Sequence, residues 1–225
     1  MFTMGAKKTP GGTGARVRVA LVEDQQMLAK LLGGWLARQR CFEFIGCAES
    51  GAKARLLCLA ANPEVVVVDI ELPDGGLELG RELVRKIPAL RVVSVSGQTD
   101  PYTVWRVRES GMHGFVDKGQ DLSSLIKAIL AVASGATYFS SVFNDVEKER
   151  LGQADAFHKI LSEREQTVLQ GVAAGCSDPV MADRFDLCVS TVAVHRKHIR
   201  QKLELHSDRE LVAYARHWGL DRTIA

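Results

Sequence analysis

The order of hydrophobic and polar positions divides the chain into two parts. From Val17 to about Gly135, short apolar runs that favour strands alternate with stretches whose apolar residues recur at helical spacing. Strands are expected at residues 17–23, 43–48, 64–70, 91–96 and 114–116, with helices near 27–36, 56–59, 77–87, 101–110 and 121–134. This alternation predicts an α/β fold, a doubly wound five-stranded parallel sheet with helices on both faces.

The part beyond Leu161 predicts a small all-α domain. Ser162 to Glu165 forms a capping box that should start a helix ending before Gly175. Helices are then expected at 180–185, with a proline in its first turn, at 190–203, and from a second capping box at Ser207 to Glu210 up to about Trp218. Two short helices joined by a tight turn match helix-turn-helix spacing.

These patterns give the expected domain boundaries. They are a disordered tail at 1–16, a first domain at 17–138, a linker at 139–158 and a second domain at 159–225. The linker is proposed because its residues are polar and weakly patterned.

Composition and net charge indicate where in the cell the protein is expected, but they say little about what it binds. The net charge is +2, and 46% of residues are hydrophobic. No apolar run approaches the ~20 residues that span a bilayer, and the first residues lack the apolar core of a signal peptide. The five cysteines include no C-x-x-C pair, which favours buried free thiols over disulfides or a zinc site. We therefore expect a cytoplasmic protein with no membrane partner.

Acidic and hydroxyl residues end several of the expected strands. The first strand ends in Glu23 and Asp24, the third in Asp69, the fourth in Ser96, and the fifth in Lys118. Because ligands of open α/β sheets bind beyond the carboxyl ends of the strands, these groups should meet on one rim. Clustered carboxylates need a compensating cation, and their hard oxygens select Mg²⁺. The pattern predicts a site for a metal and a phosphoryl group, with one aspartate available as nucleophile.

At these residues the sequence resembles a known family. Residues 17–135 are similar to the receiver domain of response regulators, whose sheet is flavodoxin-like. The motifs that carry the resemblance are Glu23-Asp24, Asp69 followed by Leu72-Pro73, Ser96-Gly97, and Lys118 preceded by Phe115. The resemblance implies that Asp69 accepts a phosphoryl group from the phosphohistidine of a sensor histidine kinase, and that the domain catalyses only its own phosphoryl transfer and dephosphorylation.

The same resemblance implies roles for the neighbouring residues. Asp24 would bind Mg²⁺ directly and Glu23 partly through water, together with Asp69 and the backbone carbonyl of Glu71. In the phosphorylated state, Ser96 and Lys118 would bind the phosphoryl oxygens. Phe115 would change rotamer when Ser96 moves.

The expected helix 190–203 has one basic, exposed face. At 3.6 residues per turn, Val192, Ile199 and Leu203 form the buried face. The polar side carries Lys197, His198 and Gln201 beside Val194, and it is flanked by Arg196, Arg200 and Lys202, with no acidic residue before Glu204. A basic helix face after a tight turn is typical of a reader of the DNA major groove.

Residues 161–218 resemble the LuxR-type helix-turn-helix. The matching positions are Leu161, Glu165, Val168, Leu169, Gly175, Ser177, Thr191, Val192, His195, Ile199, Lys202 and Leu203. The resemblance implies that the DNA-binding residues are Thr191, Ala193, Val194, Arg196, Lys197, Arg200 and Gln201. Both halves together resemble the NarL-like response regulators, transcription regulators that form a homodimer when phosphorylated or bound to DNA.

Two other functions compete with this interpretation. A nucleophilic aspartate that ends a strand also suits a haloacid-dehalogenase-type phosphatase, but that family needs a second aspartate where this chain has Glu71. Alternatively, the helical domain acts through protein–protein contacts and binds DNA weakly or not at all. The second alternative stays open because Ala193 and Cys188 stand where the LuxR-type family often has a lysine and a serine.

Overall fold

The computed structural model describes residues 16–221, and the expected tail at 1–16 lies outside the described residues except for Arg16. The chain divides into two compact units. The first comprises Met1–Gly97 and Glu109–Ser140, and the second comprises Gln98–Arg108 and Ser141–Ala225.

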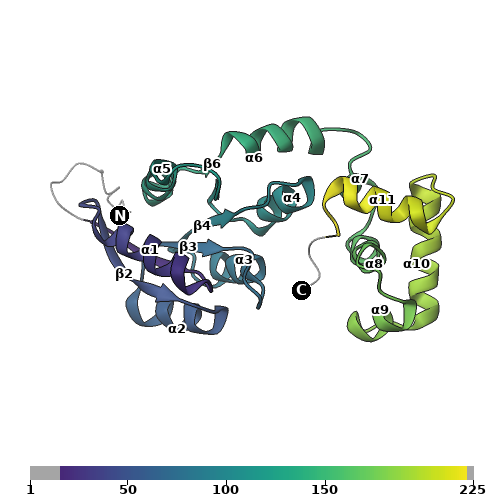
Figure 1. Ribbon diagram of the computed structural model, residues 1–225, viewed down its shortest axis with the longest axis horizontal. Helices are drawn as coiled ribbons and strands as arrows, with labels where there is room; N and C mark the ends of the chain where they lie inside the picture. The colour runs from purple at the N-terminus through teal and green to yellow at the C-terminus, as the bar shows by residue number, and fades with distance from the viewer. Residues whose placement is uncertain (1–15, 222–225) are drawn as a thin grey trace, which may run out of the picture. The chain divides into compact units, whose positions relative to one another are not determined.

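The first unit is an α/β sheet domain. Its elements are β1 (Val17–Val22), α1 (Gln26–Ala37), β2 (Phe42–Ala48), α2 (Gly51–Ala61), β3 (Val65–Asp69), α3 (Gly76–Lys86), β4 (Arg91–Ser96), β5 (Gly114–Asp117), α5 (Leu122–Ala133) and β6 (Tyr138–Phe139). The strands are parallel and lie in the order β2-β1-β3-β4-β5-β6. Figure 1 labels β2, β3, β4 and β6 of this sheet. The predicted parallel sheet is confirmed, but the strand count of five was wrong: β6 adds a sixth strand beside β5. At two residues, β6 is too short to leave a pattern in the sequence.

Alternating side chains of the central strands fill two separate cores. Val65 and Val67 of β3 pack with Leu36 of α1 and Ile129 of α5 on one face. Their neighbours Val66 and Val68 face the opposite way and pack with α2 and α3. Because the four valines are fully buried, β3 has no solvent face, as its unbroken apolar run predicts. The carboxyl end of β3 is therefore held rigidly at the middle of the sheet.

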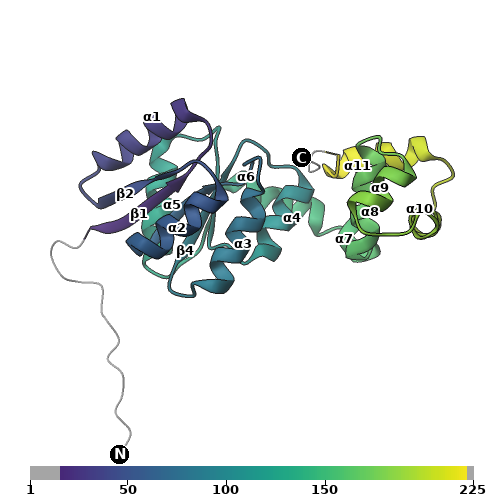
Figure 2. The same ribbon diagram turned by 90° about the horizontal axis from the view of Figure 1, so that it is seen from below.

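The second unit is helical. Its elements are most of α4 (Pro101–Ser110), α6 (Ser141–Val146), the π-helical turn η1 (Glu147–Leu151), α7 (Phe157–Ile160), α8 (Glu163–Ala173), α9 (Asp178–Arg184), α10 (Val189–Lys202) and α11 (Asp208–Trp218). Helix α8 packs against α10 and α11, and α10 also packs against α9 (Figure 2). The segment expected as a linker, 139–158, is thus largely helical.

The predicted helix caps hold in part. Ser162 and Glu165 form the complete capping box that starts α8. At α11, the hydroxyl of Ser207 accepts from the Glu210 N–H, but the Glu210 carboxylate accepts from the N–H of His206 instead of Ser207. The second box is therefore only half formed, because the glutamate reaches one residue further back.

The cysteines differ from expectation in their exposure. All five are free thiols, but Cys47 and Cys188 are exposed and only Cys58 is fully buried. Burial raises the pKa of Cys58 to about 11, so its thiol is unreactive at neutral pH. Within residues 16–221, no helix is both long enough and apolar enough to cross a membrane.

A glycine at the start of α3 tests how tightly the loop after β3 is packed. A Cβ on Gly76 would lie 2.8 Å from Ile70 Cα and meet the carbonyl group of Asp69. We predict that Gly76→Ala lowers the free energy of unfolding by about 2–3 kcal/mol, because backbone atoms must shift. Urea unfolding measures this.

The control is Gly34→Ala in the interior of α1, where a new Cβ would meet no atom within 4 Å. This change should raise the unfolding free energy by about 0.5–1 kcal/mol through helix propensity. Equal effects of the two substitutions would contradict the packing of the β3–α3 loop.

Candidate functional site

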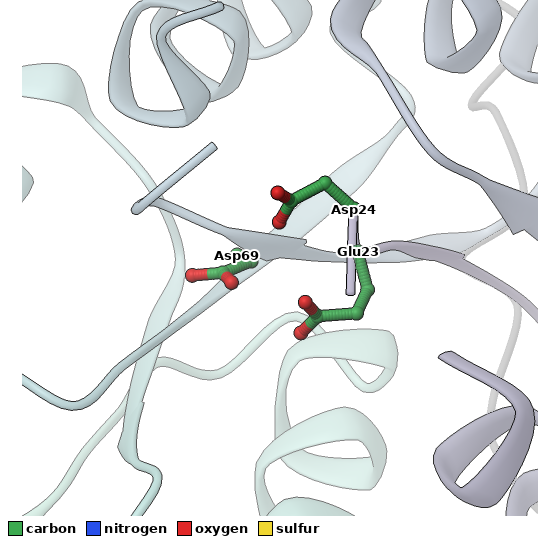
Figure 3. A group of neighbouring side chains, drawn as sticks. All are labelled: Glu23, Asp24 and Asp69. Carbon is green, nitrogen blue, oxygen red and sulfur yellow. The ribbon is translucent and has the colours of Figure 1, made fainter. Parts of the chain in front are cut away.

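The sheet brings its acidic strand ends together as predicted. Glu23 and Asp24 follow β1, and Asp69 ends the adjacent strand β3. One carboxylate oxygen from each lies within 4.8 Å of the others (Figure 3). Glu23 and Asp69 have no exposed surface, whereas Asp24 is partly exposed. The group therefore has a buried floor and one side open to solvent.

Lys118 supplies a positive charge beside this cluster. Its ammonium donates to Asp69 Oδ2 at 2.6 Å and lies 3.7 Å from Glu23 Oε2. Burial alone would lower the pKa of Lys118, but the hydrogen bond to Asp69 and the nearby carboxylates outweigh it and raise that pKa. Lys118 is thus fully charged at neutral pH.

One ammonium does not satisfy the three carboxylates. Burial, and then the charge of Asp69, raises the pKa of Glu23. Glu23 Oε1 accepts from the N–H of Gln25, but Oε2 is buried without a hydrogen-bond partner among the described residues. An orphaned carboxylate oxygen in a set of oxygen donors fits a divalent cation such as Mg²⁺. These residues could hold a metal ion.

The ends of β4 and β5 complete the rim. Ser96 lies at the end of β4, and Asp117, next to Lys118, pairs with it in register. Ser96 is fully buried, and Phe115 on β5 is also fully buried. The predicted residues of the first domain therefore lie on three adjacent strands and the end of β1.

The loop after β3 contains a contact that the sequence did not predict. The family resemblance implied only a backbone role for Glu71, but its carboxylate Oε1 accepts from Ser96 Oγ at 2.7 Å and from the Gly97 N–H at 2.6 Å. The N–H of Glu71 also donates to Asp69 Oδ1 at 2.9 Å. The signal in the sequence that could have predicted this contact is a long acidic side chain two residues after Asp69.

The exposed face of α10 agrees with the predicted orientation. Val192 and Ile199 are fully buried, whereas Leu203, just after the helix, is half-buried. Of the residues expected to bind DNA, Ala193, Val194, Lys197 and Gln201 are exposed, and Thr191 is half-buried. The face opposite the core is therefore open to a ligand.

Three of the basic side chains on α10 are paired with carboxylates of neighbouring helices. Arg196 donates to both Asp178 of α9 and Asp208 of α11, and Arg200 contacts Asp208 at 3.0 Å. Among the lysines and arginines of α10, Lys197 is the one for which the described part of the chain provides no ion pair.

The third pair ties α10 to α8. Lys202 lies 2.8 Å from Glu165, whose side chain is almost completely buried. Burial alone would raise the pKa of Glu165, but the ammonium of Lys202 and the donors of Ser162 outweigh it and lower that pKa. The capping box and this ion pair share one carboxylate.

Comparison with known proteins adds two family matches. Residues 19–130 match the family described as response regulator receiver domain, and residues 159–215 match bacterial regulatory proteins of the luxR family. The chain is 31% identical over 213 residues to the response regulator GacA of Pseudomonas protegens, covering 92% of this chain and all of that protein. It is 26% identical to the transcriptional regulatory protein DegU of Brevibacillus brevis, covering 88% of this chain and 92% of that protein.

Solved structures agree in fold. The structure of RcsB from Salmonella enterica serovar Typhimurium bound to the promoter rprA, in the presence of phosphomimetic BeF3−, has a TM-score of 0.65 to this chain. The two are 21% identical, and the match covers 89% of this chain and 98% of that one.

The paired Arg196 gives a testable consequence for stability. We predict that Arg196→Ala destabilises the packing of α10 on α9 and α11 by about 1–2 kcal/mol, because Asp178 then loses its cation and Asp208 keeps only Arg200. Amide hydrogen exchange in α10 and α11 measures the change.

The matched control is Arg209→Ala on α11, where the side chain is exposed. This change should alter the stability by less than about 0.5 kcal/mol. If both variants exchange alike, the ion pairs of Arg196 contribute nothing to the helical packing.

Proposed function

The chain belongs to the response regulators that join a receiver domain to a LuxR-type DNA-binding domain, and we propose that it regulates transcription when Asp69 is phosphorylated by a sensor histidine kinase. The observation that carries this proposal is the position of Asp69. It ends the most buried strand, between the Lys118 ammonium and the Glu23 and Asp24 carboxylates.

The chemistry follows from the groups around Asp69. Its carboxylate oxygen attacks the phosphorus of a phosphohistidine, the P–N bond breaks as the O–P bond forms, and the imidazole leaves and takes up a proton. Lys118 then pairs with a phosphoryl oxygen, and the Ser96 hydroxyl donates to another. Beyond transferring and losing its own phosphoryl group, the protein has no proposed enzymatic activity.

A magnesium ion completes the site in this proposal. Glu23, Asp24 and Asp69, with the backbone carbonyl of Glu71, would hold it. When bound, Mg²⁺ neutralises the charge that develops on the phosphoryl oxygens. The absence of a hydrogen bond to Glu23 Oε2 among the described residues supports this assignment.

The output we propose is DNA binding by α10 in the major groove. Lys197, Val194, Ala193 and Gln201 would face the base edges, with Thr191 near the helix start. Arg196 and Arg200 would contact phosphates only by releasing their carboxylate partners.

Coupling between the halves completes the proposed function. Phosphorylation would bias the Ser96–Phe115 pair and promote a homodimer that binds DNA, a shift of about 1–3 kcal/mol. The domain boundaries 17–138 and 159–225, with a linker between them, belong to this proposal. A protein that receives a phosphoryl group from a sensor kinase and binds DNA would act in the cytoplasm, which is the location that we propose.

Asp69 is predicted to be the single site of phosphorylation. Incubating the protein with Mg²⁺ and acetyl phosphate should add one phosphoryl group, detected by intact mass, because Asp69 is the carboxylate of the acidic cluster that accepts a hydrogen bond from the Lys118 ammonium. Asp69→Asn should abolish the added mass and Asp117→Asn should not. Equal labelling of Asp69→Asn and the parent would overturn the assignment.

Lys197 is predicted to carry the sequence preference of α10. It is exposed and, within the described residues, unpaired, so its ammonium can reach guanine O6 or N7. Lys197→Ala should cost about 1–3 kcal/mol on the preferred site and little on random DNA, measured by fluorescence anisotropy.

Arg200→Ala is the comparison variant. It should weaken binding to specific and random DNA about equally. The loss of affinity should be smaller than for an arginine with no carboxylate partner, because Arg200 must first leave Asp208 to contact a phosphate. If Lys197→Ala also loses affinity equally for both DNAs, Lys197 contacts only phosphate. No binding to any genomic fragment would favour a protein-binding output.

A further inference from the structure

The Glu71 carboxylate lies where two hydrogen-bond donors converge. The Ser96 hydroxyl and the Gly97 N–H, consecutive groups at the end of β4, both donate to Glu71 Oε1. Two donors aimed at one oxygen form an anion site, and charge-assisted hydrogen bonds of this kind are short and strong. In the unphosphorylated protein this anion site is filled by a side chain of the same loop.

The site belongs to the surroundings of Asp69. The Glu71 N–H donates to Asp69 Oδ1 at 2.9 Å, and Lys118 donates to Asp69 Oδ2 at 2.6 Å. A phosphoryl group on Asp69 brings three further anionic oxygens beside these donors. The hydroxyl of Ser96 has a single proton to donate, so it cannot serve both Glu71 and a phosphoryl oxygen.

We propose that the Glu71 carboxylate occupies the place of one phosphoryl oxygen in the resting protein and must leave before Ser96 and Gly97 bind phospho-Asp69. This inference rests on the proposed phosphorylation of Asp69 and adds a competitor within the chain to it. Glu71 is therefore a positioning residue that acts through Ser96 and Gly97.

Charge and exposure explain how the exchange can occur. A phosphoryl group carries about −1.5 to −2 charges against one for a carboxylate, so it is the stronger ligand for the two donors. Glu71 is exposed as a residue, so its released carboxylate can be hydrated by bulk water. The competition slows phosphorylation without preventing it.

The first experiment observes the occupied site without phosphorylation. In full-length protein carrying Asp69→Asn, the amide proton of Gly97 is followed by NMR, with and without a further Glu71→Ala change. A proton bonded to a carboxylate resonates far downfield, so Glu71→Ala should move it upfield. An unchanged Gly97 shift would overturn the proposal, and this result does not depend on whether Asp69 is phosphorylated.

The second experiment measures the competition. With Mg²⁺ and acetyl phosphate, Glu71→Ala should be labelled roughly tenfold faster than the parent, and Glu71→Gln, which keeps one acceptor but no charge, should be intermediate. Asp74→Asn is the control, since this carboxylate is on the same loop but accepts from the Gly51 N–H.

The outcomes separate the two hypotheses. If no variant with Asp69 intact is labelled, the proposed phosphorylation fails while the NMR result still reports on Glu71. Labelling of Glu71→Ala at the parent's rate would show that the carboxylate does not compete. Equal acceleration of labelling by Asp74→Asn would also contradict the proposal, because the effect would then come from the change in net charge.

Discussion

The burial of negative charge at the end of a hydrophobic sheet is the constraint around which the first domain is organised. Asp69 must lie at the end of β3 because the valines before it fill both cores. At that depth water cannot solvate its charge, so Lys118 at the end of β5 pairs with it, and Glu23 Oε2 keeps no hydrogen bond among the described residues. With three carboxylates and one ammonium, the site could hold a metal ion beside the carboxylates.

In the second domain the arrangement of charges is reversed, because basic side chains are surrounded by carboxylates. Helix α10 carries lysines and arginines but no acidic residue. Carboxylates of α8, α9 and α11 form ion pairs with three of these cations. Arg196, held by acids on two helices, fixes the relative positions of α9, α10 and α11. This leaves Lys197 as the freely available cation on the helix face, among the described residues.

Sequence periodicity was sufficient for the sheet and for most helices. The runs ending in Glu23-Asp24, Asp69 and Ser96 placed those side chains on one rim, because parallel strands share a carboxyl end. The two-residue β6 left no period to detect. The ion pairs of Arg196 join segments 12 and 18 residues away, and no local pattern encodes them. The Glu71 carboxylate was missed because its partner Ser96 lies 25 residues later.

The neutralised arginines of α10 also bear on how such a protein searches a genome. Non-specific attachment to DNA is almost entirely electrostatic and grows with each cation that displaces a counterion. With Arg196 and Arg200 engaged by Asp178 and Asp208, fewer charges are available for that attachment. Under the proposed role of α10, the domain would stay bound to unrelated sequences for a shorter time, and a larger share of the molecules would diffuse freely between visits to the target.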